Sequence, residues 1–254
     1  MEADWISSSE TGALVNSTAI LPRMCITGMS GLVGSILEKH LKQRFRLLAI
    51  NRRNNLPGVP TIRADISSSA GLAEAMRGVR VVIHLAASSF PPNAGSTLIN
   101  TNVTGTYNIL EASVEAGVKQ FIFASSLSTI AGHYPALRPE IEARGSWPKE
   151  ELRALVSNLS PRPDSVYGAS KIWGETLCRL YHDQHRMGCV AIRLGGLFRN
   201  NLPDPNASDG WIKWCSHADL FASIDQALDI TEDGGFAILN AITGGGPTDL
   251  IGPR

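Results

Sequence analysis

The stretch TGMSGLVG, residues 27–34, decides the fold of this chain. It joins a short apolar run at 24–27 to a segment at 30–44 whose apolar side chains recur at helical spacing. Its three glycines are three residues apart: Gly28, Gly31 and Gly34. In a strand–turn–helix unit, such glycines permit a tight turn, let a pyrophosphate approach the backbone, and let the helix pack closely on the strand. The stretch therefore predicts a dinucleotide site at the start of the first helix.

Short apolar runs and amphipathic segments keep alternating along the rest of the chain. We expect strands at 46–50, 59–63, 79–87, 119–126, 189–196 and 236–240, and helices at 70–77, 98–116, 166–185 and 216–229. Strands joined by helical crossovers form a parallel sheet with helices on both faces. The pattern predicts an α/β protein, a Rossmann-type doubly wound parallel sheet with a small C-terminal substrate-binding region. Its expected parts are an N-terminal extension (1–22), a dinucleotide-binding domain (23–196) and a C-terminal region (197–254).

Composition narrows the function. The 254 residues carry 23 Lys and Arg against 23 Asp and Glu, and this neutral balance lacks the positive field that nucleic acids attract, so we expect no nucleic-acid partner. The four cysteines form no CxxC pair, which predicts neither a zinc knuckle nor a disulfide framework and favours the reducing cytoplasm. No stretch has the roughly 20 apolar residues that span a bilayer, so we expect no membrane partner. We also expect no metal site.

The end of the second predicted strand bears on the choice of cofactor. An acidic residue normally lies there when the ribose diol of NAD is bound, but this chain has Asn51 followed by Arg52 and Arg53. A guanidinium can form paired hydrogen bonds with a 2′-phosphate, which a carboxylate would repel. We predict NADP, with NAD as the alternative if the arginines only face solvent. Asp65, after the third strand, either accepts a hydrogen bond from the adenine amino group or is a surface turn residue.

A possible catalytic pair lies further along the chain. Tyr167 and Lys171 are four residues apart in VYGASK, so they share one face of the predicted helix. A phenol near pKa 10 is a poor acid or base at neutral pH, and an ammonium beside it favours the phenolate. The pair therefore suits proton exchange with an alcohol or carbonyl oxygen.

Together these motifs resemble those of the extended short-chain dehydrogenases/reductases, also called the NAD-dependent epimerase/dehydratase family, over about residues 23–240. The matching segments are TGMSGLVG, Asp65, HLAA at 84–87, NVTGTYNILEA at 102–112, FIFASS at 121–126 and YGASK at 167–171. Within the family the chain is most similar to uronate dehydrogenases, which share the pattern of WCSHADL at 214–220.

The resemblance implies an oxidoreductase that transfers hydride between a nicotinamide and a carbonyl or secondary alcohol of a small molecule, and the predicted NADP preference favours the direction of reduction. The implied catalytic residues are Ser126, Tyr167 and Lys171. The implied cofactor-binding residues are Gly28, Met29, Ser30, Gly31, Leu32, Val33, Gly34, Asn51, Arg52, Arg53, Asp65, Ile66, Leu85, Ala86, Ala87, Asn102, Ala124, Tyr167, Lys171 and Leu194. The implied substrate residues are Ser88, Ser89, Ser126, Leu127, Ser128 and Gly196. A homodimer through the helices at 98–116 and 166–186 is also implied.

The chain departs from the uronate dehydrogenases near the expected substrate. Leu127 and Ser128 stand where those enzymes have Asn-His, and ASDGWIK at 207–213 lacks the arginine that clamps the sugar carboxylate. Gly196 replaces a residue with a hydroxyl. These differences predict a less polar pocket and argue against a hexuronate substrate.

A stretch at about 138–162 is additional to the usual family length. It contains Pro148 at the expected first position of a helix. It is either a lid over the pocket or a surface or interface element.

Two other functions stay open at this point. One is a sugar or nucleotide-sugar epimerase or dehydratase with tightly bound NAD, and the other is a cofactor-binding sensor without turnover.

Overall fold

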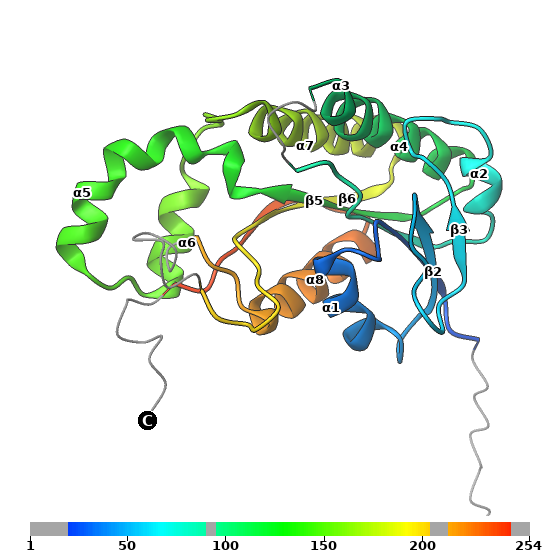
Figure 1. The fold of residues 1–254 in the computed structure, drawn as a ribbon, viewed down its shortest axis with the longest axis horizontal. Helices are drawn as coiled ribbons and strands as arrows, with labels where there is room; N and C mark the ends of the chain where they lie inside the picture. The colour runs from blue at the N-terminus through cyan, green and yellow to red at the C-terminus, as the bar shows by residue number, and fades with distance from the viewer. Residues whose placement is uncertain (1–19, 90–94, 204–212, 245–254) are drawn as a thin grey trace, which may run out of the picture.

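The computed structural model describes residues 20–89, 95–203 and 213–244 (Figure 1). Its centre is a seven-stranded sheet in the order β3-β2-β1-β4-β5-β6-β7, with every pairing parallel. The strands are β1 (Arg23–Thr27), β2 (Arg46–Asn51), β3 (Thr61–Arg63), β4 (Val81–His84), β5 (Gln120–Ser126), β6 (Gly188–Leu194) and β7 (Phe236–Ala241). The predicted doubly wound α/β fold is confirmed. The strand order reverses between β1 and β4, and in such sheets ligands bind at this point.

Helices cover both faces of the sheet (Figure 1). One face is covered by α1 (Leu32–Leu41) and α8 (His217–Glu232), and the other by α2 (Leu72–Ala75), α4 (Gly105–Glu115) and α7 (Val166–His185). Because neighbouring side chains of a strand point to opposite faces, Cys25 packs under α4 and α7 while Ile26 packs under α1 and α8. Burial on both faces explains the continuous apolar runs of the central strands.

Several expected elements differ in their limits by a few residues, and two of the differences bear on the site. The helix expected at 98–116 is divided into α3 (Gly95–Leu98), a π-helical segment η1 (Ile99–Thr104) and α4. Short π-helical segments are rare and lie inside α-helices, so the sequence pattern did not indicate this one, and they are frequent at functional sites. The strand expected at 79–87 ends at His84, since the chain then leaves the sheet.

The additional stretch forms two helices at the β7 end of the molecule (Figure 1). Two short 3-10 turns, η2 (Leu127–Thr129) and η3 (Ala131–His133), lead into α5 (Tyr134–Arg144), which the sequence did not predict, and then α6 (Lys149–Ser157). Pro148 is the N-cap of α6 and not its first helical residue. A separate apolar cluster holds this region together: Leu127, Ile130, Ile141, Trp147, Leu152, Val156 and Ile242.

Asp219 on α8 ties α6 to the rest of the fold. Its carboxylate pairs with Lys149 and with Arg153, at 3.3 Å, and accepts hydrogen bonds from Ser216 Oγ at 2.7 Å and Thr243 Oγ1 at 2.8 Å. Burial alone would raise the pKa of Asp219, but the hydrogen bonds from Lys149, Ser216 and Thr243 hold it below its ordinary value. The ionised carboxylate therefore anchors the additional stretch to α8.

All four cysteines are buried free thiols. Within the described ranges, no helix is both long and apolar enough to cross a membrane.

Candidate active site

The glycine turn forms the floor of the site. Gly28 has φ +68°, and its N–H donates to Ile50 O at 2.8 Å. A Cβ at Gly28 would lie 2.7 Å from Ala86 Cα, and one at Gly34 would lie 2.3 Å from Met29 O. Neither backbone neighbour can move aside easily, so the turn requires glycine at both positions. The N-terminus of α1 then faces the carboxyl ends of β1 and β4.

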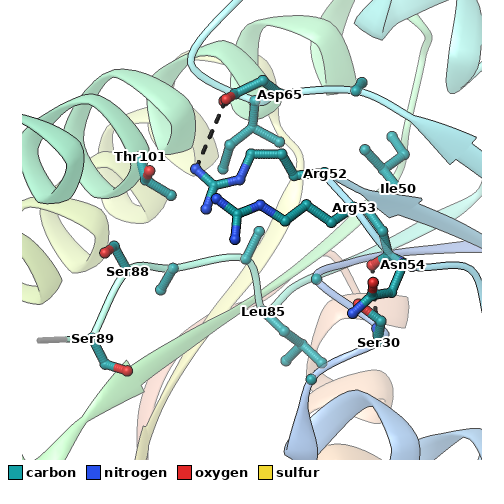
Figure 2. A pocket seen from close by; sticks show the side chains of 17 residues that line it. Ser30, Ile50, Arg52, Arg53, Asn54, Asp65, Leu85, Ser88, Ser89 and Thr101 are labelled. Atoms are coloured by element: carbon teal, nitrogen blue, oxygen red, sulfur yellow. Dashed lines mark hydrogen bonds and ion pairs between the residues drawn. The ribbon is translucent and has the colours of Figure 1, made fainter.

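A pocket of about 430 Å³ lies beside this turn (Figure 2). Asn51 lies at its wall with 3% exposure, and Asn51 Oδ1 accepts a hydrogen bond from Ser30 N at 3.2 Å. Arg52 and Arg53 extend from the end of β2 toward the pocket, side by side (Figure 2). The first pocket is therefore bordered by two cations at the end of β2.

Asp65 faces Arg52 across the rim of the first pocket. Arg52 NH1 lies 3.9 Å from Asp65 Oδ2, while Asp65 Oδ1 accepts hydrogen bonds from Ser67 N at 3.0 Å and Ser67 Oγ at 2.8 Å. These hydrogen bonds, more than the Arg52 charge, lower the pKa of Asp65. Asp65 is thus a turn residue at the rim of the first pocket, and its hydrogen bond with an adenine amino group stays a prediction.

A second pocket, of about 280 Å³, continues from the first toward β5 and β6. The two pockets share Leu85, Ala87 and Ser89, which follow β4. Together they form a groove along the carboxyl ends of the strands, where a doubly wound sheet binds its ligand.

Ser126, Tyr167 and Lys171 meet at the second pocket. Tyr167 lies in the first turn of α7, which Ser165 caps by accepting a hydrogen bond from Gly168 N at 3.2 Å. Lys171 Nζ donates to Ala124 O at 2.7 Å and lies 5.5 Å from the centre of the Tyr167 ring. The three residues come from β5 and α7, and these two elements pack directly together.

The ionisation of this pair differs from the expectation. Burial lowers the pKa of Lys171 from 10.5 to about 8. Burial also raises the pKa of the Tyr167 phenol, and a hydrogen bond with Ser126 only partly opposes it. The predicted net lowering of the Tyr167 pKa by Lys171 is therefore not observed, because desolvation outweighs the other influences.

Most of the predicted site residues line this groove. They are Gly28, Ser30, Gly31, Leu32, Val33, Asn51, Arg52, Arg53, Asp65, Ile66, Leu85, Ala86, Ala87, Ser88, Ser89, Ala124, Ser126, Tyr167, Lys171 and Leu194.

Six predicted residues do not line either of the two pockets: Met29, Gly34, Asn102, Leu127, Ser128 and Gly196. Met29 is fully buried against the sheet, and Leu127 belongs to the apolar cluster of the additional stretch. Gly196 pairs with Trp214 as an isolated bridge. Ser128 supports Ser126, since Ser128 N donates to Ser126 Oγ at 3.1 Å and Ser126 Oγ donates to Ser128 Oγ at 3.2 Å.

Asn102 acts behind the groove and not in it. Its Oδ1 accepts from Ser88 N at 2.7 Å, and its Nδ2 donates to Ser88 O at 3.1 Å and to Ser170 Oγ at 3.0 Å. Asn102 therefore ties the loop after β4 to the helix that carries Tyr167.

The sequence missed several residues that line the groove: Ile50, Asn54, Ala64, Thr101, Ser125, Gly195 and Leu197. Most are direct neighbours of predicted residues at strand ends. Their place at the carboxyl end of a strand could have identified them as pocket residues. Thr101 lies in η1, which the sequence did not reveal. Within the described residues, neither pocket is lined by α5 or α6, so a lid formed by that stretch has no support here.

Comparison with known proteins agrees with this architecture. The model of the NAD dependent epimerase/dehydratase family matches residues 24–212. The chain belongs to this family. The predicted membership and the predicted class, an NAD(P)-dependent oxidoreductase of the short-chain dehydrogenase/reductase type, are confirmed.

Two relatives come from Haloferax volcanii. An L-arabinose 1-dehydrogenase (NAD(P)(+)) is 32% identical over 82% of this chain and 83% of its own length. An NAD-dependent glucose-6-phosphate dehydrogenase is 31% identical over 76% and 75%. The uronate dehydrogenase of Pseudomonas putida is 29% identical over 84% and 73%.

Among solved structures, a glucuronic acid dehydrogenase from Chromohalobacter salexigens has a TM-score of 0.70 at 24% identity, covering 88% of this chain and 77% of that one. This likeness shows the shared fold.

Proposed function

We propose that this chain is an NADP-preferring reductase that acts on a carbonyl group of a small molecule. The observation that carries the proposal is the meeting of Ser126, Tyr167 and Lys171 at one pocket that continues into the pocket bordered by Arg52 and Arg53. The groove fits a dinucleotide, because glycines form its floor and the buried Asn51 Nδ2 has no hydrogen-bond partner among the described residues. When bound, NADPH supplies the hydride.

The three side chains divide the remaining work. Tyr167 gives its proton to the substrate oxygen, and its raised pKa keeps the phenol protonated, as reduction requires. Ser126 donates a hydrogen bond to the same oxygen and stabilises the charge that develops there. Lys171 holds its ammonium over the Tyr167 ring and would bind the ribose of the cofactor. Gly28 and Gly31, with the N-terminus of α1, receive the pyrophosphate.

Net cofactor consumption tests the reaction class. We expect purified protein to oxidise NADPH with members of a carbonyl panel, followed as loss of absorbance near 340 nm. The substrates named for its relatives, L-arabinose, glucose 6-phosphate and a uronate, are to be tried in the oxidative direction. Conversion of a sugar without net cofactor change would indicate an epimerase instead. Cofactor binding without any turnover would indicate a sensor.

The arginine pair is expected to decide the cofactor. Arg52→Ala combined with Arg53→Ala should weaken NADPH binding by about 1–3 kcal/mol, the range for charge-assisted hydrogen bonds, and leave NADH binding nearly unchanged. Quenching of tryptophan fluorescence measures both affinities. Arg63→Ala is the matched control, because Arg63 Nε bonds to Asn55 outside the pocket. Equal losses for the two cofactors would overturn the assignment of these arginines to a 2′-phosphate.

Ser126 is expected to act mainly on the chemical step. Ser126→Ala should lower kcat by about 10²-fold, the scale of one lost donor to a developing oxyanion. Ser128→Ala serves as the comparison, since Ser128 contacts Ser126 and does not line the pocket. Steady-state kinetics with the best carbonyl substrate measures kcat for both variants. A larger loss for Ser128→Ala would move the donor role to that residue.

We further propose a homodimer through α4 and α7. Large apolar side chains on these helices are exposed, with Tyr107 at 45%, Trp173 at 42% and Leu180 at 42%. Light scattering at micromolar concentration should give twice the chain mass, and Trp173→Glu with Leu180→Glu should give the monomer. A wild-type monomer under these conditions contradicts the proposal.

We also propose that residues 23–196 hold the cofactor, that 197–254 supply the substrate side, and that the protein works in the cytoplasm. Leu197 at the second pocket supports the division, and four buried thiols suit a reducing compartment. Cell fractionation tests the location.

A further inference from the structure

Three buried side chains join β5, β6 and α7 beside the second pocket. Glu175 of α7 and Arg193 of β6 form a paired contact, with Nε to Oε1 and NH2 to Oε2 both at 2.8 Å. Ser125 Oγ of β5 donates to Glu175 Oε1 at 2.5 Å. Their exposures are 2% for Ser125, 4% for Glu175 and 5% for Arg193, so all three are buried, with Ser125 at the wall of the second pocket.

Stability alone does not explain a buried ion pair at this place. Removing two charges from water costs several kcal/mol per ion in general, and well-packed apolar side chains often serve a fold equally well. The network also lies directly next to the residues of the second pocket. Ser125 and Arg193 are register partners in the sheet, one residue before Ser126 and Leu194 of the pocket.

Glu175 is a potential competitor for the lysine of the site. It follows Lys171 by four residues on α7, and side chains at this spacing are neighbours on a helix surface, with about 5–6 Å between their Cβ atoms. A carboxylate at that distance can bind an ammonium. In the structure Lys171 instead donates to Ala124 O at 2.7 Å and lies over the rings of Phe123, at 4.9 Å, and Tyr167, at 5.5 Å.

We propose that Arg193, assisted by Ser125, occupies the carboxylate of Glu175 and so keeps the Lys171 ammonium on the Ala124 carbonyl, facing the second pocket. Glu175 and Arg193 are then positioning residues that act through Lys171. The catalytic meaning of this arrangement rests on the proposed function, which makes Lys171 part of the active site. The geometric arrangement can be tested without any substrate.

The ionisable groups around Lys171 determine how its pKa should respond to each substitution. The ionisable groups near it are Tyr167 and Glu175 on α7, Arg193 on β6, and His84 on β4. His84 is neutral, because burial lowers its pKa to about 3. Burial lowers the pKa of Lys171, and the opposite charges of Glu175 and Arg193 are paired with each other. Removal of either partner leaves one uncompensated charge, negative in one case and positive in the other.

The experiment is an NMR titration of the lysine 13Cε signals of the full chain from pH 6 to 11, with the Lys171 signal assigned by its loss in Lys171→Met. We expect a wild-type midpoint near pH 8. Arg193→Met should raise it by about one pH unit and Glu175→Gln should lower it by about one pH unit, from charges several ångströms away at an effective dielectric constant of about 20. The double variant should return close to the wild-type midpoint.

Opposite shifts with cancellation are the result that a purely structural role does not give. Shifts in the same direction, or none, would overturn the inference. Arg193→Lys keeps the charge and should hold the midpoint near the wild-type value. If Arg193→Met does not fold, Glu175→Gln and the double variant decide, because only a downward shift that the second change reverses agrees with the inference. Failure of the proposed function would show separately, as turnover that survives Tyr167→Phe.

Discussion

Tyr167→Phe is expected to lower kcat by about 10²- to 10⁴-fold, the contribution typical of a positioned proton donor. The change removes only the hydroxyl and keeps the ring, which contacts the Lys171 ammonium at 5.5 Å from the ring centre. The cofactor groove therefore stays intact, and the affinity for NADPH should change little. An equal fall in kcat and kcat/KM would show that the lost interaction exists only in the transition state.

Tyr107→Phe is the matched control for this experiment, because Tyr107 lies on α4 and lines neither pocket. It should retain wild-type turnover. If Tyr167→Phe also turned over at the wild-type rate, the proton would have to come from another group. Ser128, which contacts Ser126, and His133 would then be the next residues to examine, and the proposed mechanism would be withdrawn.

The sheet and the cofactor groove could be predicted because their signals are local. A parallel sheet buried on both faces leaves apolar runs, and the glycines at 28 and 34 are required by contacts with the neighbouring backbone at Ala86 and Met29. The helix at 166–185 was predicted with its observed limits, since a serine caps its start and its apolar face is regular. Local pattern and global fold agree in these places.

Other features depend on packing that no local pattern records. The π-helical segment around Asn102 is six residues long and lies between two α-helices, so the sequence predicted one continuous helix. α5 has a weak apolar face and contains Pro139 within the helix, and its packing into the cluster with Trp147 depends on residues outside its own local pattern. Leu127 likewise packs into that cluster and does not line the pocket, and this choice depends on contacts with residues far along the chain.

The pKa of Tyr167 could not be predicted from the sequence either. The spacing of Tyr167 and Lys171 placed them together correctly, but the direction of the Tyr167 pKa shift depends on how deeply the phenol is buried. Burial is set by elements from distant parts of the chain, so the pair was predicted and its electrostatics was not.

Lys171→Met is expected to damage both cofactor binding and turnover. Methionine keeps the unbranched shape of the side chain but removes the ammonium, so contacts with the ribose and the favourable charge beside Tyr167 are lost together. We expect NADPH affinity to fall by about 1.5–3 kcal/mol, the range for a hydrogen bond to a charged group, and kcat to fall by about 10²-fold or more. Fluorescence titration and steady-state kinetics measure the two losses.

The stability of the same variant should move in the opposite direction. Folding lowers the pKa of Lys171 from 10.5 to about 8, so the unfolded chain binds the lysine proton more tightly than the folded one. The buried cation therefore destabilises the wild type by at most about 3 kcal/mol below pH 8, and this penalty fades as the pH rises toward 10.5. Denaturant unfolding should accordingly show that the stability of Lys171→Met relative to the wild type is greatest near pH 7 and declines between pH 8 and 10.5. A difference that does not change with pH would mean that Lys171 is not held as a buried cation, and its place in the site would need to be reconsidered.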